Sequence, residues 1–246
     1  AVKVRFGGLL FNGDEGRATY TVESDGLKGW LKGGVGVRRE SVSRPNAHGD
    51  FDTPSFRTGR RVTLQGLILT ESPASQDHAI RQLTGMLASG QKGRFFVDNA
   101  LGTTWADMRL IDVQVSRRVY GTVADYRIEL WGANPRIFGE SRTFTAGEPA
   151  YHYGNFDAIP ELVVTGVYAS GYTVSASGKS YVVTQALAAG QTHRIDLRSG
   201  WLYRNNVLQS GAVGAAGSWT VPPGQRVTHS LTGSGVLKVT VVDTYM

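Results

Sequence analysis

The residues best suited to bind a metal ion alternate along one polar segment. His48, Asp50 and Asp52 would point to one side of an extended backbone, because side chains alternate between faces along a strand. One imidazole and two carboxylates can bind a divalent cation. Residues 43–58, however, contain two prolines, a glycine and no sustained hydrophobic period. A long loop or mobile arm is therefore the favoured interpretation, and we assign no metal.

Two other groups of residues are candidates for enzyme chemistry. Gly178-Lys179-Ser180 resembles the end of a phosphate-binding loop, but Thr173 stands where that loop needs its first glycine, and a strand pattern follows. A glycosidase needs two carboxylates roughly 5–9.5 Å apart, and Glu161 and Asp196 are the pair that a cleft could bring together. No Gly-x-Ser-x-Gly elbow and no cysteine occur. We therefore expect a protein that is not an enzyme and has no cofactor.

Three aromatic residues in the second half could bind carbohydrate. Trp201, Tyr203 and Trp219 fall in short strand patterns, and exposed aromatic rings of this kind stack on sugars. Packing in a hydrophobic core is the alternative role for such residues. The sequence leaves both roles open.

Composition indicates a folded, mainly β protein. Glycine accounts for 32 of 246 residues, about twice the usual roughly 7%, and Tyr, Trp and Phe are plentiful, which favours strands joined by tight turns. No apolar run approaches the roughly 18–20 residues of a membrane helix, so no membrane role is expected. Residues 1–145 hold 20 Lys/Arg against 15 Asp/Glu, but the two signs are interleaved. Specific nucleic-acid binding is therefore not expected.

The first half combines strands with a single convincing helix. The clearest strand is 60–70, and Ser72 and Pro73 can cap and open the helix that follows. Ile80, Leu83 and Leu87 form an apolar stripe, and Gly90 is expected just after the helix end. Strands at 94–98, 103–110, 111–120 and 123–131 follow, with Val113 and Val115 matched to Tyr126, Ile128 and Leu130 in a hairpin.

The boundary between the halves is expected near residue 145. Asn134-Pro135 should end the first half, and residues 140–148 are polar and interrupted by glycine, as a linker would be. Beyond Pro160, short strands with Gly or Pro turns between them predict a β-sandwich or jelly roll. We predict domains 1–145 and 146–246.

The segment that opens the second half carries a family resemblance. "YGNFDAIPELVVTG", residues 153–166, resembles the aromatic-Gly-Asn…Pro…Gly pattern that opens the C-terminal domain of bacteriophage (siphophage) distal tail and minor tail proteins. "GQTHRIDLRSG" at 190–200 and "SWTVPPGQ" at 218–225 are similar to later motifs of that family, although the second has two prolines and ends in Gln225. "GLKGW", "RPNAHGDFD" and "GRRVTLQGLIL" resemble its N-terminal motifs, so the likeness covers nearly the whole chain.

This resemblance implies a structural virion protein. The N-terminal domain would be a split β-barrel with one helix that forms a hexameric ring, and the C-terminal domain a galectin-like β-sandwich. The ring would join the tail tube to the tail tip or baseplate hub, with the tape measure and receptor-binding proteins as further partners and DNA passing through. Assembly would take place in the cytoplasm of the host bacterium.

A ring-forming protein needs arms or edges that pair with its neighbours. The loop 44–57 is the candidate arm, with Arg44, His48, Phe51 and Phe56 as its contact residues. Arg57, Arg60 and Arg61 could form ion pairs across subunits. The alternative function is a carbohydrate- or receptor-binding module in which the second domain recognises the ligand.

Overall fold

The computed structural model describes residues 2–13, 18–118 and 121–246, and the chain divides into two compact units, 1–137 and 138–246. Each unit is described by itself. The polar stretch expected to be a linker is instead strand β10 (Ile137–Thr145), most of which belongs to the second unit. That interpretation was wrong because the polar side chains of β10 have partners in the second unit, as shown below.

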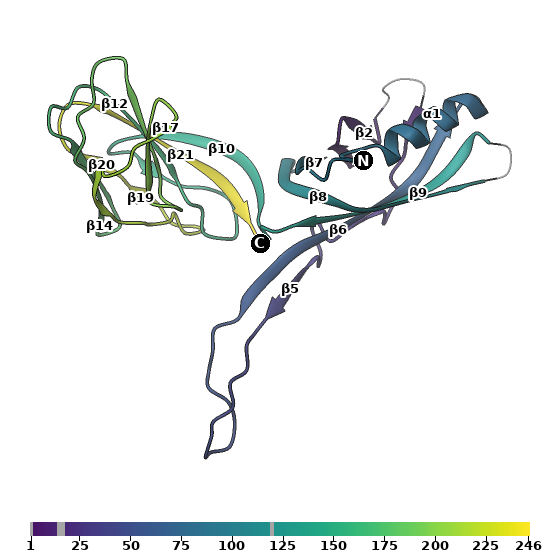
Figure 1. Cartoon of the computed structure of the whole chain (residues 1–246), viewed down its shortest axis with the longest axis horizontal. Helices are drawn as coiled ribbons and strands as arrows, with labels where there is room; N and C mark the ends of the chain where they lie inside the picture. Colours follow the sequence, from purple (N-terminus) through teal and green to yellow (C-terminus); the bar gives the residue numbers. More distant parts are fainter. Residues whose placement is uncertain (1, 14–17, 119–120) are drawn as a thin grey trace. The chain divides into compact units, whose positions relative to one another are not determined.

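The first unit is built around a closed barrel of seven strands (Figure 1). Around the barrel the order is β1-β2-β3-β6-β9-β8-β7 and back to β1, with only β2 and β3 parallel. The strands are β1 (Lys3–Phe6), β2 (Leu9–Phe11), β3 (Ala18–Tyr20), β6 (Phe56–Thr70), β7 (Gly93–Asn99), β8 (Gly102–Arg117) and β9 (Val123–Gly132). Alternate residues face inward, so that Phe11, Leu64, Phe95 and Ile128 are fully buried.

Additional strands lie on β6, and the barrel strands β8 and β9 pair as a hairpin. The additional strands are β4 (Leu27–Lys28) and β5 (Val35–Arg38). The predicted hairpin is confirmed, with Val113 opposite Ile128 and Val115 opposite Tyr126, whereas Leu130 lies opposite Leu110. The strands expected at 103–110 and 111–120 form one strand, β8, because a β-bulge after Leu110 continues the ladder across the expected break. Residues 119–120 lie outside the described part.

Helix α1 (Pro73–Thr84) begins where the sequence predicts and ends earlier. The Ser72 side chain accepts a hydrogen bond from the backbone N–H of Ser75, and Pro73 stands at the start. The helix stops at Gly85 rather than shortly before Gly90, and turns fill the interval. Its buried residues are Gln76, Ala79 and Leu83, so only Leu83 of the predicted stripe is fully buried. No helix in the described residues is long and apolar enough to cross a membrane.

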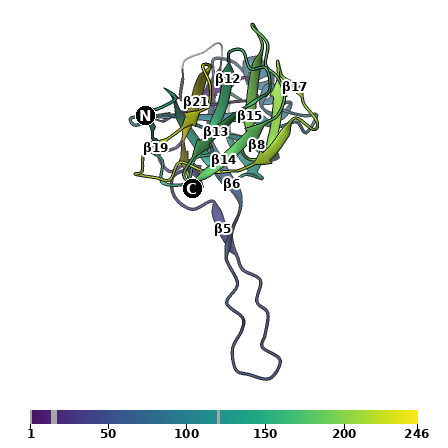
Figure 2. The same cartoon turned by 90° about the vertical axis from the view of Figure 1, so that its left-hand side faces the viewer.

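The second unit is a β-sandwich, as predicted (Figure 2). One sheet has the order β17-β16-β15-β12-β21-β10 and the other β18-β14-β13-β20, with a short β11–β19 pair beside them. The remaining strands are β11 (Pro149–Ala150), β12 (Glu161–Thr165), β13 (Tyr172–Ala176), β14 (Lys179–Val183), β15 (Thr192–Asp196), β16 (Trp201–Arg204), β17 (Val207–Leu208), β18 (Val213–Ala216), β19 (Val227–Thr228), β20 (Ser230–Leu231) and β21 (Val236–Tyr245). Leu162 and Ile195 from one sheet share a core with Val174 and Tyr181 from the other.

Candidate functional site

The phosphate-loop and metal candidates have other roles in the fold. Ser177 and Gly178, both with positive φ, turn β13 into β14, and Lys179 Nζ donates to Ser218 O at 2.7 Å. In the arm, the Asp50 carboxylate accepts from the Ser41 hydroxyl, and Asp52 lies 3.3 Å from Arg39. Within the described ranges no three His, Cys, Asp or Glu residues gather as a metal site would require.

Glu161 and Asp196 are brought together, but on an open sheet face. They are direct cross-strand partners in β12 and β15, and Leu162 and Ile195 beside them point into the core. Asp196 accepts hydrogen bonds from the backbone N–H of Arg198 and the Ser199 hydroxyl, both at 2.9 Å, and so closes the turn into β16. The side chain of Glu161 is about half exposed.

The predicted arm is a two-stranded ribbon that extends from the barrel (Figures 1 and 2). β5 pairs with the first residues of β6, and the chain continues as an irregular hairpin with a bridge between Ser43 and Asp50. Phe51 N–H donates to Val42 O at 2.8 Å. The segment expected to be an irregular loop therefore has a hydrogen-bonded backbone.

The side chains of this arm are mostly solvent-exposed. Phe51 is 49% exposed, and the Arg44 guanidinium lies 5.8 Å from the centre of its ring. His48 is also exposed. Phe56, expected in the loop, is instead the first residue of β6 and is exposed beside Arg38. The ribbon thus presents two phenylalanines among charged residues, without a covering element in the described chain.

Arg60 anchors the base of the arm and is buried, which the sequence did not indicate. Its Nε donates to Pro135 O at 2.9 Å, and Nη1 donates to Gly29 O at 2.8 Å and Trp30 O at 3.1 Å. Burial lowers the pKa of Arg60 below its ordinary value. Because three backbone carbonyls within its own unit occupy the guanidinium, the expectation of an ion pair from Arg60 across subunits is wrong.

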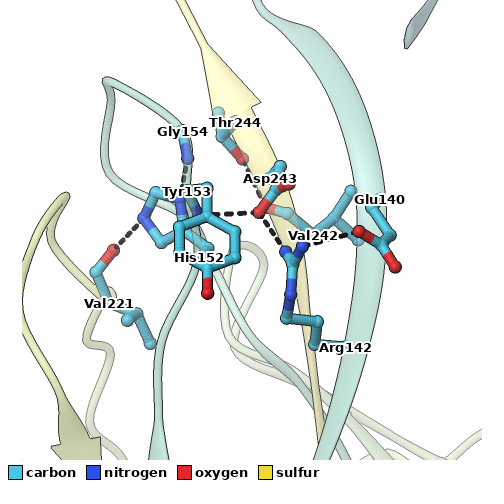
Figure 3. A network of polar contacts seen from close by, with 9 residues as sticks. All are labelled: Glu140, Arg142, His152, Tyr153, Gly154, Val221, Val242, Asp243 and Thr244. Carbon is cyan, nitrogen blue, oxygen red and sulfur yellow. Dashed lines mark hydrogen bonds and ion pairs between the residues drawn. The ribbon is translucent and has the colours of Figure 1, made fainter. Parts of the chain in front are cut away.

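The Tyr153-Gly154-Asn155 segment of the second unit is fixed by a buried ion pair (Figure 3). Asp243 of β21 pairs with Arg142 of β10 and also accepts the Tyr153 backbone N–H at 2.8 Å. Arg142 makes a second ion pair with Glu140 at 2.6 Å, and its guanidinium lies 4.4 Å from the Tyr153 ring centre. The polar residues of β10 therefore hold the segment in place.

Contacts with neighbouring residues explain why the Tyr153-Gly154-Asn155 motif contains a glycine and an asparagine. Buried His152 accepts the Gly154 N–H at Nδ1 (2.9 Å), and its Nε2 donates to Val221 O (3.0 Å), so both ring nitrogens have a partner (Figure 3). A Cβ on Gly154 would lie 2.0 Å from Thr244 O, which only glycine avoids. Asn155 Oδ1 accepts the backbone N–H of Met246. The motif is therefore the contact between the start of the unit and its last strand.

Of the three aromatic candidates, two lie together and the third does not. Trp201 and Tyr203 share the outer face of β16, with ring centres 6.5 Å apart, and Trp201 is 53% exposed. Trp219 is buried in the sandwich core, where its Nε1 donates to His229 Nε2 at 3.1 Å. This corrects the expectation that Trp219 could stack on a sugar, since its ring fills the core.

Two residues missed by sequence reasoning complete this face. Arg194 lies opposite Tyr203 in β15, with its guanidinium 4.1 Å from the Tyr203 ring centre and 3.7 Å from the Glu161 carboxylate. Leu208 of β17 flanks Tyr203 on the other side. Strand alternation alone could have placed Arg194 on the outer face, but the strand order could not be read from the sequence.

Comparison with known proteins finds likeness in structure alone. No family model matches the chain, and no curated protein matches it by sequence. The SPP1 Dit protein, described as a paradigm of the hub adsorption apparatus in phages that infect Gram-positive bacteria, has 10% identity, a TM-score of 0.77 and full coverage of both chains. Chains of the phage P2 baseplate in its activated conformation, with Ca or Sr, give TM-scores of 0.53 and 0.52 at 8% identity, with 98% coverage of both chains. The chain therefore shares the fold of the SPP1 Dit protein and of these baseplate chains.

Proposed function

We propose that this chain is a structural virion protein at the distal end of a long, non-contractile phage tail. It forms a hexameric ring that connects the tail tube to the tail tip or baseplate. The observation that carries the proposal is the likeness to the SPP1 Dit hub protein, which covers 100% of both chains and so extends over both units. No catalytic step is part of this function.

The partners of the ring follow from the proposed position. The tail tube protein would lie on one side and the tape measure and tip or receptor-binding proteins on the other, and DNA would pass through without sequence-specific contacts. The arm, with Arg44, His48, Phe51 and Phe56, is the proposed subunit contact, because it exposes aromatic rings and open strand edges. The protein would be located at the virion tail tip after assembly in the host cytoplasm.

The mass of the purified protein in solution tests the ring directly. We expect light scattering after size exclusion to give six times the 26.5 kDa chain mass, and negative-stain images of the same peak to show closed rings. The second measurement repeats this with the purified tail tube protein added, since that partner can act as a template for assembly. A chain that stays monomeric alone and with the tube protein would refute the hexameric ring.

The exposed aromatic face of the second unit supports a second candidate function. Trp201 and Tyr203 lie on an open sheet face, where they could contact a carbohydrate or receptor at the host surface. Virions assembled with Trp201→Ala would then have normal tails and reduced adsorption to host cells. Unchanged adsorption would exclude this role.

A further inference from the structure

The outer face of the second unit orders its side chains in two rows across neighbouring strands. One row is Glu161, Asp196 and Trp201, and the next is Val163, Arg194, Tyr203 and Leu208. Strands lie about 4.8 Å apart, so each row places its side chains in direct lateral contact range. Two carboxylates therefore lie in line with the most exposed indole of this unit, and a guanidinium stacked on Tyr203 lies beside them.

These rows have the composition of a sugar-binding surface rather than a protein interface. A protein partner seated on Trp201 would remove water from Glu161 and Asp196, whose present partners are Arg194 and the turn before β16, and burying a carboxylate is costly unless all its acceptor sites are paired. Charged residues are accordingly depleted from the centres of protein interfaces. A pyranose instead brings hydroxyl donors to the carboxylates and an apolar ring face to the indole.

The charged side chains in the same row as Trp201 are carboxylates, which disfavour an anionic ligand on the indole. Arg194 is already paired with Glu161 at 3.7 Å, and its guanidinium lies 4.1 Å from the centre of the Tyr203 ring. Each oxygen of Asp196 accepts one hydrogen bond from the turn, which leaves acceptor capacity for ligand hydroxyls. An anionic sugar or phosphate placed on Trp201 would lie beside the carboxylate of its cross-strand partner Asp196, while the exposed cations nearby are Arg198 in the turn and Lys238, three strands away opposite Val163.

We infer that this face binds a neutral hexopyranose of a surface polysaccharide, with Trp201 as the stacking residue and Glu161 and Asp196 as hydrogen-bond acceptors. The inference rests on the second candidate function and names its ligand class. One such site on an open sheet is weak. Several copies in one assembly would raise the overall affinity for a repeating polymer by about 10²–10⁴-fold through effective concentration.

The test is a titration of the purified full-length protein with neutral trisaccharides of glucose, galactose and N-acetylglucosamine, followed by tryptophan fluorescence and ligand-observed NMR. A poly(glycerol phosphate) oligomer is the anionic comparison. We expect millimolar binding of at least one neutral sugar and none of the anionic polymer. Trp201→Ala should weaken binding at least about tenfold, and Glu161→Ala about threefold to tenfold.

Tyr153→Ala is the matched control, because it removes an aromatic ring that is 68% exposed, against 53% for Trp201, elsewhere in the same unit. It should leave sugar binding unchanged, and thermal unfolding should show that every variant is folded. Three results would overturn the inference. They are no binding of any neutral sugar at tens of millimolar, sugar binding that survives Trp201→Ala, and binding of the anionic polymer alone. If adsorption to host cells still depended on Trp201 in that case, the second unit would bind a receptor through a different ligand class. The mass measurement tests the hexameric ring independently of this result.

Discussion

Replacing Asp243 tests whether the ion pair in the second unit holds the Tyr153-Gly154-Asn155 segment. The carboxylate side chain of Asp243 is 6% exposed and that of Arg142 is 17% exposed, so the pair is largely desolvated. Losing one partner of a buried pair costs about 3–5 kcal/mol. Arg142 keeps Glu140 as a partner and some contact with water, so we expect Asp243→Ala to cost about 2–3 kcal/mol of unfolding free energy.

Two further variants separate the charge from the hydrogen bond. Asp243→Asn keeps an oxygen for the Tyr153 N–H but removes the charge, so its cost should be smaller, about 1–2 kcal/mol. Glu140→Gln is the control, because it removes the other carboxylate near Arg142 at a position that is 73% exposed. Exposed pairs contribute about 0–1 kcal/mol.

Differential scanning calorimetry of the full chain measures these effects, with the transition of the second unit assigned by its sensitivity to Trp219→Phe. A loss of 1 kcal/mol should lower the midpoint by roughly 4 °C or more for a unit of this size. Hydrogen exchange should also become faster at the backbone amides of the Tyr153-Gly154-Asn155 segment. If Asp243→Ala shifted the midpoint no more than Glu140→Gln, or left exchange there unchanged, the ion pair would not hold the segment.

Three other predictions concern the motif, the core and the arm. Gly154→Ala should destabilise the second unit by more than about 2 kcal/mol in urea unfolding, because the alanine Cβ would meet the backbone of the last strand. A smaller loss of unfolding free energy would mean that the backbone around this contact relaxes readily. Burial lowers the pKa of His193 and His229 in the folded chain. Their contribution to the free energy of unfolding is therefore complete above the ordinary histidine pKa of about 6.5, and it falls below that pH by up to about 1.4 kcal/mol per pH unit for each histidine. A free energy of unfolding that stays constant between pH 6.5 and 5 would contradict this. Deleting residues 46–54 should abolish self-association without a change in midpoint, and normal assembly of the deletion variant would exclude the arm as the subunit contact.

Local chemistry could be predicted from the sequence, because neighbouring residues determine it. Ser72 and Pro73 indicate the helix start through capping and a fixed φ. The alternation in Val113, Val115 and Ile128 predicted a hairpin that is confirmed, since strands joined by a short connection pair with each other.

The helix end and the boundary strand both differ from what the sequence predicted. Helix α1 stops at Gly85, where turns take over, although the apolar period continues to Leu87. β10 looked like a linker because its residues are polar. Its Arg142 is stabilised by Asp243, which lies about a hundred residues later in the chain, and no local pattern reveals such a partner.

The sequence by itself therefore determined the class of each unit, since alternation and turn residues act over a few positions. Only the tertiary structure decided which side chains share a surface. Strand order places Glu161 and Asp196 beside Trp201, while the same fold buries Trp219 and Arg60. The reason is that closing the barrel and stacking the two sheets join strands far apart in sequence, and burial follows from those pairings rather than from residue type.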